Sequence, residues 1–391
     1  MARTRDDTRA FSNDAPTAAT QADLLVERHQ LPDDVNLAIS GLLRDLAHIH
    51  QDQPKQAAYR RAAAVIAGID RPLTELVHAG RLEKLPGVGP SIERTILEYL
   101  ETGASSTVDR ALAEASRDRQ RSVMRRRRVR ANFLSVARAR HVLLQDRRDA
   151  VRLEDYRGDL QQHSLWSDGS ETLEEIADSS MSLGQQYAAL TDHFALPVAG
   201  GLSAEDFARQ HEDIDALNER LGGRFRLLKG VEANILADGT IEMLPQQLAS
   251  MEVVVASPHS LLRRDYDQTA RMVNAVTQPG VHILGHPRGR RFNDREGVLA
   301  DWDEVFHAAA ERQVAIEIDG SWERQDVDYE LAARALSVGC VFALDSDAHS
   351  PRERHFSAIA IAHARLAGIP AARIINCWTL GRLVEWLKAK G

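Results

Sequence analysis

Seven short apolar runs follow one another between residues 158 and 349, and segments long enough to hold helices separate them. Strands that alternate with helices pair in parallel, because each helix carries the chain back to the same end of the sheet. Seven such units in series predict a parallel α/β barrel close to the eight-stranded type. The runs are GDLQQHS, YAALTDH, RLLKGVE, EVVVASPH, VHILGHP, VAIEIDG and VFALDSDAH.

Nearly every one of these runs ends in a residue that can bind a metal ion. The C-terminal ends of parallel strands meet at one mouth of a barrel, where barrel enzymes carry their active sites. Five of the fifteen histidines stand at these ends, whereas the other ten lie mostly in helical stretches or in the N-terminal tail. A single histidine there would more often belong to the core or the surface, but five at one topological position indicate a metal site. The candidates are His163, Asp168, Asp192, His193, Glu232, His259, His286, Asp347 and His349.

The types of donor indicate the chemistry of this site. Imidazole and carboxylate groups without thiolates suit zinc, manganese or iron(II), and they disfavour copper(I) or a structural zinc finger. Roughly eight donors exceed the needs of one ion, so we expect two or three divalent ions bridged by a carboxylate. The positive charge of three such ions would exceed the negative charge of Asp168, Glu232 and Asp347, which favours the binding of hydroxide and a phosphate ester. The sequence therefore predicts a metal-dependent phosphoesterase.

Arginines follow directly after the fifth run, in the segment PRGRRF. A guanidinium can hold a phosphate through two parallel hydrogen bonds. We expect at least one of Arg288, Arg290 and Arg291 to clamp the substrate phosphate, although each of them is alternatively a solvated surface residue. The catalytic candidates are therefore Asp192, Arg288 and Arg290.

The N-terminal part of the sequence has a helical pattern. Apolar residues recur at spacings of two to four from Val35 onward, which predicts a small all-α domain over residues 34–103. The domain ends in LEKLPGVGPSIERTILEYLETG, where the glycines permit a tight turn and the helix start near Pro90 exposes free N–H groups. A helix start of this kind can bind a DNA phosphate. The arrangement resembles a helix-hairpin-helix module, which contacts the nucleic-acid backbone. The alternative is an ordinary helix–helix turn. The nucleic-acid-binding candidates are Gly87, Gly89, Ser91, Tyr59 and Arg94.

Two further segments flank this helical domain. Residues 1–33 lack sustained apolar periodicity, so we expect a disordered tail. Residues 104–152 form an arginine-rich helical connector, whose charge peaks in MRRRRVRANFLSVARARHVLL. In a chain of net charge −8, such a run is a candidate contact for a phosphate backbone. The alternative is a helix that pairs with acidic neighbours of its own chain.

Seven motifs together resemble the polymerase-and-histidinol-phosphatase (PHP) domain, most closely the version at the C-terminus of bacterial family X DNA polymerases. They are GDLQQHSLWSDGS, ALTDH, GVEANILADGTI, VVVASPHS, ILGHPRGRRF, AIEIDG and LDSDAHS, and the resemblance covers residues 155–391. It implies a distorted seven-stranded (β/α) barrel with a trinuclear metal centre in a domain of residues 153–391, and it makes Asp192 a residue that orients a neighbour. The implied ligands are Gln161, His163, Glu232 and Asp347 for the first ion, Glu232, His259 and His286 for the second, and Asp168, His193 and His349 for the third.

The sequence departs from these families at three points. Gln161 stands where the PHP family usually has histidine, so the first ion should bind less tightly, unless Gln161 hydrogen-bonds a water at that ion instead. Residues 36–103 resemble the lyase-type DNA-binding domain of family X polymerases, but Ser91 and Thr95 replace the lysines expected there, and we expect no lyase reaction. The connector is too short for a nucleotidyltransferase domain, so we expect no polymerase activity.

Composition limits the partners and the compartment. The negative net charge argues against a generally basic nucleic-acid-binding protein and leaves this role to local patches. Cys340 and Cys377 form no CxxC pair and no disulfide framework, which suits a reducing compartment. No apolar run is long enough to cross a bilayer, and the N-terminus has no signal pattern. We expect a soluble cytoplasmic protein without membrane contact, and its oligomeric state stays open.

The leading hypothesis is a metal-dependent phosphoesterase that acts on nucleic acid, as a 3′–5′ exonuclease or in DNA 3′-end processing. It depends on the ligands at the strand ends, on the hairpin module and on the arginine-rich connector. One alternative is a small-molecule phosphatase of the histidinol-phosphate type, because barrel sites of this kind serve either substrate. A second alternative is a DNA-end-binding adaptor, whose barrel is inactive because Gln161 weakens the first metal site.

Overall fold

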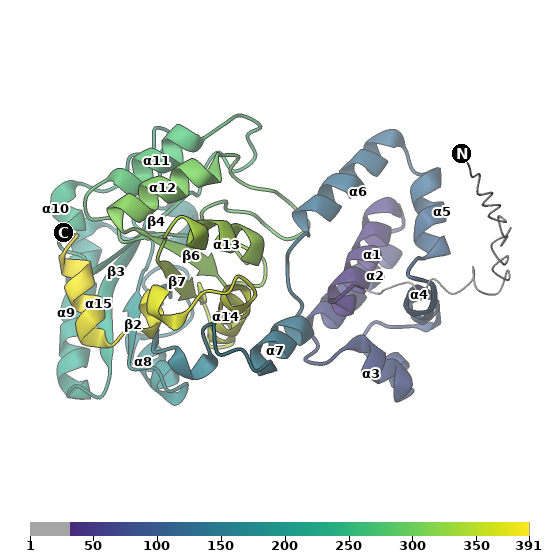
Figure 1. The fold of residues 1–391 in the computed structure, drawn as a ribbon, viewed down its shortest axis with the longest axis horizontal. Coiled ribbons are helices and arrows are strands. Elements are labelled where there is room, and N and C mark those ends of the chain that lie inside the picture. Colours follow the sequence, from purple (N-terminus) through teal and green to yellow (C-terminus); the bar gives the residue numbers. More distant parts are fainter. Residues whose placement is uncertain (1–31, 391) are drawn as a thin grey trace, which may run out of the picture.

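The computed structural model describes residues 32–390, which form two connected parts, one all-helical and one a barrel (Figure 1). The tail expected to be disordered, residues 1–33, lies outside the described residues except for its last two positions. The barrel carries the predicted metal ligands, and the helical part covers one side of the loops around them.

The helical part packs its helices around one small apolar core. Asp34 and Asp52 begin the first two helices, where each carboxylate accepts a backbone N–H three residues further on. Leu43, Ile66 and Ile96 are fully buried between these helices. The helices are α1 (Val35–Ile49), α2 (Gln53–Gly68), α3 (Leu73–His78), α4 (Pro90–Thr102) and α5 (Ser106–Glu114).

The arginine-rich connector contains α6 (Arg117–Val129) and α7 (Val136–Leu144). Arg127 and Arg130 each lie 2.7 Å from a carboxylate oxygen of Asp45 on α1, and Asp45 is 1% exposed. These two arginines therefore hold α6 against α1. This is the alternative stated for the connector, a helix that pairs with acidic residues of its own chain instead of a phosphate backbone. Further connector pairs join Arg138 to Asp33 and Arg140 to Asp70. Arg125 remains exposed and pairs with no carboxylate of the described residues.

The barrel contains seven parallel strands in the order in which they occur along the chain. The first and last strands are joined by one bridge, in which the N–H of His163 donates to the carbonyl of Ala348 at 2.9 Å. The predicted distorted seven-stranded α/β barrel, preceded by a small all-α domain, is therefore confirmed. The strands are β1 (Gly158–Asp159), β2 (Tyr187–Leu190), β3 (Arg226–Asn234), β4 (Val253–Ser257), β5 (Ile283–Leu284), β6 (Ala315–Asp319) and β7 (Phe342–Asp345).

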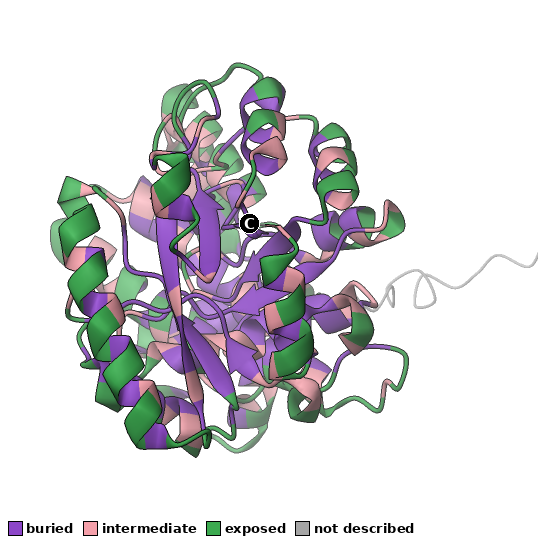
Figure 2. Ribbon diagram, turned by 90° about the vertical axis from the view of Figure 1, so that its left-hand side faces the viewer, coloured by how far each residue is buried: buried purple, intermediate pink, exposed green. Residues whose placement is uncertain are grey.

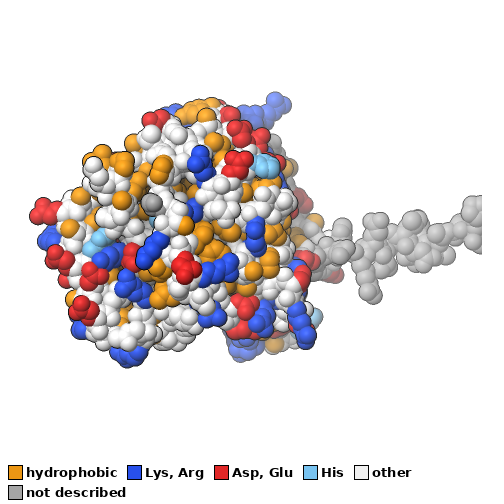
Figure 3. Space-filling model, turned by 60° about the vertical axis from the view of Figure 1, so that its left-hand side comes forward, with side chains coloured by type: hydrophobic (Ala, Val, Ile, Leu, Met, Phe, Trp, Pro, Cys, Tyr) orange, Lys and Arg blue, Asp and Glu red, His pale blue; other side chains and the backbone are white. Residues whose placement is uncertain are grey.

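Helices surround these strands, and Figure 2 shows buried strands inside a layer of helices whose outer faces are exposed. Charges of both signs are mixed on the outer face drawn in Figure 3, so this face presents no patch of one sign. The helices are α8 (Leu173–Ser182), α9 (Ala204–Leu221), α10 (Pro245–Leu248), α11 (Thr269–Thr277), α12 (Trp302–Arg312), α13 (Tyr329–Ser337), α14 (Ser357–Leu366) and α15 (Leu380–Lys388). None of the helices between residues 32 and 390 combines the length and the apolar character needed to cross a lipid bilayer.

The last helix, α15, fills one end of the barrel. Its residues Leu383 and Leu387 join an apolar cluster with alternate residues of the strands, among them Tyr187, Leu228 and Val255. Because side chains alternate between the two faces of a strand, these residues point into the barrel. The end that α15 covers is opposite to the mouth where the predicted ligands lie.

The helical part contacts the barrel through the loop that follows β5. Phe292 of this loop packs edge-to-face on Phe133, with ring centroids 4.9 Å apart. The guanidinium of Arg44 on α1 lies over the same ring, 5.1 Å from its centroid. Arg130 donates to the side chain of Asn293 at 2.5 Å. The loop after β5 is therefore held in place by both parts of the molecule.

Candidate metal centre

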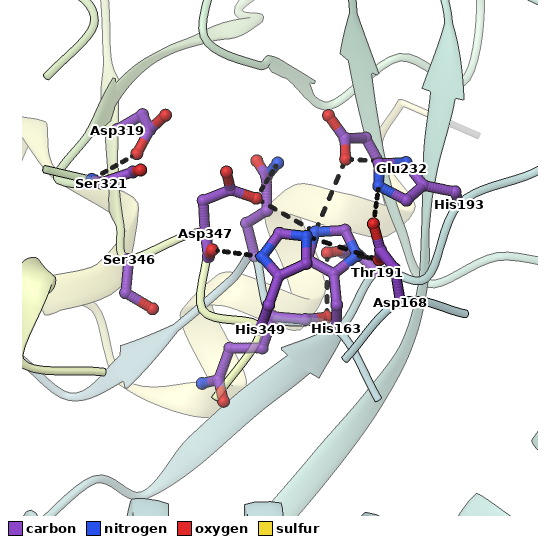
Figure 4. Close-up of polar contacts among 12 residues, drawn as sticks. His163, Asp168, Thr191, His193, Glu232, Asp319, Ser321, Ser346, Asp347 and His349 are labelled. Carbon is purple, nitrogen blue, oxygen red and sulfur yellow. Dashed lines mark hydrogen bonds and ion pairs between the residues drawn. The ribbon is translucent and has the colours of Figure 1, made fainter. Parts of the chain in front are cut away.

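The predicted ligands gather at the C-terminal mouth of the barrel. Each of them follows a strand or, in the case of Glu232, lies near the C-terminal end of one, and parallel pairing brings these strand ends together. The side chains that Figure 4 shows turned toward one another are His163, Asp168, His193, Glu232, Asp347 and His349.

Glu232, in the second half of β3, is at the middle of the cluster and is almost fully buried. Its Oε1 lies 2.7 Å from Nε2 of His286 and 3.3 Å from Nε2 of His259. Its Oε2 lies 3.1 Å from Nδ1 of His193 and 3.6 Å from Nε2 of His163. Each oxygen of one carboxylate thus faces two imidazoles, which is the geometry expected of a carboxylate that bridges two cations.

Asp347 follows β7 and forms a second side of the cluster. One of its oxygens, Oδ1, lies 3.1 Å from Nε2 of His163 and accepts a hydrogen bond from Nε2 of Gln161 at 3.4 Å. The other oxygen contacts the guanidinium of Arg324. Asp347 has φ +52°, a left-handed backbone conformation that turns its carboxylate toward the mouth. Gln161 thus lies beside the expected first ion.

Asp168, in the turn after β1, forms the outer side of the cluster. Its carboxylate lies 3.4 Å from Nε2 of His349, 3.6 Å from Nε2 of His193 and 3.8 Å from Nδ1 of His163. It is the most exposed of the carboxylates in this cluster, and it stands between the buried imidazoles and solvent. A ligand entering the mouth would reach this side first.

Several buried polar atoms of the cluster make no hydrogen bond within the described residues. A buried nitrogen or oxygen without a partner costs free energy, so a polar or charged group is expected to satisfy these atoms. The atoms include Oε1 of Gln161, Nδ1 of His163, Oε2 of Glu232 and Nε2 of His259. Donor atoms within 4.8 Å of one another form three overlapping groups. The groups are His163, Asp168, His193 and His349; His193, Glu232 and His259; and His163, Glu232 and Asp347. The residues fit divalent cations.

Burial changes the pKa values of several groups in the cluster. Burial lowers the pKa of His286 to about 4, and burial together with neighbouring imidazoles lowers the pKa of His163 well below its usual value. Burial works to raise the pKa of Glu232, but His193 and His259 hold it well below the usual range. The lowered pKa values of His163, His193 and His286 favour their neutral forms, from which a cation need displace no proton.

Sequence reasoning missed a residue that positions His259. Nδ1 of His259 lies 2.6 Å from Oδ1 of Asn234, the last residue of β3, which leaves Nε2 directed at Glu232. The amide nitrogen of Asn234 in turn donates to Glu242 at 2.7 Å. A partner of this kind fixes the tautomer and the orientation of a metal-binding imidazole. The only sequence signal was its place two residues after Glu232, on the same face of the strand.

The structure assigns Asp192 a supporting position and corrects its place among the catalytic candidates. The carboxylate accepts hydrogen bonds from the backbone N–H and hydroxyl of Ser164 at 2.8 and 2.7 Å, and from Gln210 at 2.7 Å. Ser167 donates to it as well. These hydrogen bonds join Asp192 to the turn that carries Asp168, and its expected orienting role stays a prediction.

The structure also corrects the assignment of Arg288 and Arg290 as phosphate clamps. Arg288 donates to Asp326 at 2.9 Å and to Asp328 at 2.7 Å. Arg290 is 3% exposed, donates to Asp328 at 3.2 Å and lies over the ring of Phe133. Both guanidinium groups stabilise the junction between the loop after β5 and the loop after β6, so neither is free for a substrate.

Other arginines line the cavity beside the cluster. This cavity, hereafter the inner cavity, has a volume of about 400 Å³. Its wall includes Arg291, Arg295, Trp322 and Arg324 together with Asp347 and His349. Arg291 was among the predicted phosphate-binding residues, whereas sequence reasoning missed the other two arginines and Trp322. The segment SWER directly after β6 contains two of these three residues.

The predicted nucleic-acid-binding residues lie around the start of α4. Gly89 begins this helix, Gly87 has φ +82°, and Ser91 and Arg94 are exposed. Tyr59 is only 9% exposed and belongs to the core of the helical part, which corrects its place among the contact residues. Figure 1 shows α4 on the side of the helical part away from the barrel, so the hairpin and the metal cluster are well separated.

Comparison with known proteins matches both parts of the chain. A helix-hairpin-helix domain family matches residues 35–105. DNA polymerase/3′-5′ exonuclease PolX of Bacillus subtilis (strain 168) is 34% identical over 242 residues, which are 61% of this chain and 42% of that relative. The chain therefore spans less than half the length of this relative.

Shorter relatives are covered almost completely. The probable phosphatase YcdX of Escherichia coli O81 (strain ED1a) is 27% identical over 248 residues, which are 60% of this chain and 96% of the relative. Among solved structures, histidinol phosphate phosphatase from Lactococcus lactis aligns with a TM-score of 0.44 and 18% identity, over 55% of this chain and 94% of that one.

Proposed function

The chain joins a helix-hairpin-helix domain to a barrel related to the PHP phosphoesterase of bacterial family X DNA polymerases, and on this premise we propose that it hydrolyses phosphate esters at the 3′ end of nucleic acid. The observation that carries the proposal is the position of Glu232 among four imidazoles, at a barrel mouth that opens next to an arginine-lined cavity. The reaction is a 3′–5′ exonuclease or 3′-end-processing step in the cytoplasm, without polymerase activity.

The residues of the mouth have distinct roles in this proposal. Two or three divalent cations, of manganese, zinc or iron(II), would supply Lewis-acid chemistry when bound here. Glu232, Asp347 and His163 would hold the inner side of this centre, and Asp168 would hold the outer side nearest to solvent. Gln161 holds its amide against Asp347 and leaves Oε1 without a partner in the described residues. Asp192 keeps the turn of Asp168 in position.

The helical part supplies a contact to the DNA backbone in this proposal. The N–H groups at the start of α4 follow the glycine turn, and the positive end of the helix dipole there would attract an anionic phosphate. Gly87 brings its Cα close to α2, because a Cβ there would lie 3.4 Å from the backbone nitrogen of Ala62. This contact carries no base specificity, since the donors are backbone groups.

The test is cleavage of DNA by the metal-loaded protein. The Mn²⁺-loaded chain is incubated with single-stranded and gapped DNA labelled at the 3′ end, and with p-nitrophenyl phosphate. We expect release of labelled nucleotides, and loss of that release in His259→Ala, which removes one imidazole from Glu232. Hydrolysis of the monoester without cleavage of either DNA would contradict the nucleic-acid substrate.

A small-molecule phosphatase is the second candidate, and one observation favours it. The relatives that this chain covers almost completely, such as YcdX, are named probable phosphatases. The same assay separates the two candidates, because this function predicts turnover of a phosphate monoester alone. A third candidate, a DNA-end-binding adaptor with an inactive barrel, predicts that no metal is retained after reconstitution, which metal analysis measures.

A further inference from the structure

Three arginines and three carboxylates line the inner cavity, and Arg295 is the arginine among them that forms no ion pair within the described residues. Arg291 pairs with Glu323, and Arg324 contacts Asp347. Arg295 has no carboxylate oxygen within ion-pair distance in the part of the chain that the structure describes, and its Nε donates to the carbonyl of Gly289 at 2.7 Å. Its two terminal nitrogens make no hydrogen bond with any described residue, and the residue lines the inner cavity.

Other guanidinium groups surround Arg295. Burial lowers the pKa of Arg295, and the nearby charges of Arg324 and Arg263 lower it further. Asp294 acts in the opposite direction, but its carboxylate pairs with Arg263 at 2.6 Å. A half-buried arginine among like charges is stabilised by a bound anion.

Arg295 also lines a neighbouring cavity of about 320 Å³, hereafter the outer cavity. The outer cavity continues to Arg263 and Arg264 of the loop after β4 and to Arg125 of α6. Because Arg295 belongs to the walls of both cavities, the two cavities adjoin at this residue. Their walls contain arginines interspersed with carboxylates, and arginines distributed over two adjoining cavities suit successive phosphates of one strand better than a single phosphate.

Trp322 is the aromatic indole residue on the wall of the inner cavity, which Phe356 also lines. It is half-buried, and its ring packs against Phe292 with centroids 5.5 Å apart. Phe292 is itself held by Phe133 and Arg44 from the N-terminal side of the molecule. The indole N–H of Trp322 makes no hydrogen bond with any described residue. An aromatic ring held in this way is a platform on which a nucleobase can stack.

We propose that the inner and outer cavities bind the single-stranded segment on the 5′ side of the linkage that is cut, with a base stacked on Trp322 and a backbone phosphate held by Arg295. The proposal deepens the proposed function and rests on it. A small phosphate monoester has neither a second phosphate nor a neighbouring base. The two cavities therefore select an oligonucleotide over a monoester, while the metal centre itself accepts either.

The experiment compares Trp322→Ala and Arg295→Gln with wild type. Binding of a fluorescein-labelled dT15 oligonucleotide is measured by anisotropy, and kcat/KM is measured for dT15 and for p-nitrophenyl phosphate. We expect Trp322→Ala to weaken dT15 binding about tenfold, because stacking on an aromatic side chain contributes that order of affinity. Arg295→Gln should reduce the slope of log affinity against log salt concentration by about one, the contribution of a single phosphate contact. In both variants, kcat/KM should fall more for dT15 than for the monoester.

Three further variants control for fold and for general charge. Trp322→Phe keeps a stacking face and should restore most of the dT15 affinity. Arg334→Gln removes an exposed charge on α13 that pairs with Asp303, and it should leave dT15 binding and its salt slope unchanged. Arg295→Lys keeps the charge and should keep the salt slope. Thermal unfolding of each variant shows whether it is folded.

The outcomes separate this proposal from the proposed function. If wild type cuts DNA but folded Trp322→Ala and Arg295→Gln bind dT15 as wild type does, the cavities are not the strand site, although the nuclease function stands. If dT15 binding depends on Trp322 while only the monoester is hydrolysed, the strand site stands and the nuclease function fails. Absence of dT15 binding by wild type overturns the strand site.

Discussion

The guanidinium of Arg324 contacts the carboxylate of Asp347, one of the residues expected to hold a divalent cation. The same guanidinium lies 3.5 Å from Asp319 at the end of β6. An arginine and a metal ion repel one another when they share a carboxylate. Arg324 thus competes with a cation for Asp347, and it is positioned to turn toward a substrate phosphate when a cation binds.

Arg324→Gln should therefore bind metal more tightly than wild type. Removing the competing charge should lower the dissociation constant for Mn²⁺ by about tenfold, or about 1.4 kcal/mol. Competition with a fluorescent chelator measures the constant, and Arg352→Gln is the matched control, because Arg352 is an exposed arginine on the loop after β7. Equal constants in all three proteins would show that Arg324 and the cation do not compete.

Gln161→His should tighten the ion nearest to Asp347. An imidazole is a stronger donor than an amide oxygen, and Gln161 is fully buried with its amide 3.4 Å from Asp347. Gln161→Leu should have the opposite effect, because leucine offers no donor. Metal content after dialysis against a chelator checks both variants. If neither variant changes the metal content or the rate, Gln161 is not a ligand of this ion.

Asn234→Ala should weaken metal binding by about 10- to 100-fold, the range observed when a partner of a metal-binding imidazole is removed. The physical reason is that His259 loses the acceptor that directs its Nε2 toward Glu232. Asn234→Asp keeps an oxygen at this position and should keep most of the affinity. Titration calorimetry with Zn²⁺ distinguishes the two variants, and an equal loss in both would argue against the orienting role.

Arg290→Met should destabilise the fold by about 3 kcal/mol, because it removes buried interactions with Asp328 and with three backbone carbonyls. Arg291→Met is the matched control from the same segment, and it should cost less than about 1 kcal/mol, since Arg291 and its partner Glu323 are exposed. Urea unfolding measures the free energies. A cost for Arg290→Met no larger than that for Arg291→Met would contradict the structural role.

The stability of the barrel should depend on pH through His282. Burial lowers the pKa of His282 to about 4, whereas an unfolded histidine titrates at about 6.5. Between these values the unfolded chain binds a proton that the folded chain does not bind. The free energy of unfolding therefore falls as the pH drops from about 6.5 toward 4, by at most ~1.4 kcal/mol per pH unit for this group.

His282→Asn separates this contribution from those of other groups. Asparagine still offers an oxygen acceptor for the N–H of Val254, but the variant loses the ring nitrogen that lies 3.1 Å from the carbonyl of Leu387, so it starts less stable than wild type at pH 7. Because it also lacks the titrating imidazole, the difference in unfolding free energy between the two proteins should shrink at lower pH. Urea unfolding at pH 7, 6 and 5 measures the difference, and a constant difference would contradict the lowered pKa.

The fold could be predicted because its signals are local. Each strand is a short apolar run and each is followed by a helical stretch, so parallel pairing and a common mouth follow without knowledge of any long-range contact. The positions of His163, Glu232 and His286 near one another follow from the same rule. Their use as ligands stays a prediction.

The roles of the arginines could not be read from the sequence. Arg288 and Arg291 are three residues apart in one loop, yet the first is half-buried and paired with Asp326 and Asp328, and the second is exposed at the inner cavity. Which way each side chain turns depends on carboxylates about 40 residues away in the sequence. The connector shows the same effect, since Arg130 meets Asp45 across 85 residues. The periodicity of apolar residues in the sequence does not predict ion pairs between residues so far apart.

The position of α15 has a consequence for how the protein is made. The floor of the barrel includes Leu383 and Leu387, whereas the core of the helical part lies between Ile39 and Val108. A chain that leaves the ribosome N-terminus first can fold its helical part early. The apolar core of the barrel stays incomplete until α15 has been synthesised. The ligands at the opposite mouth take up their geometry only after that moment. Translation itself thus sets the earliest time at which the centre can load its ions.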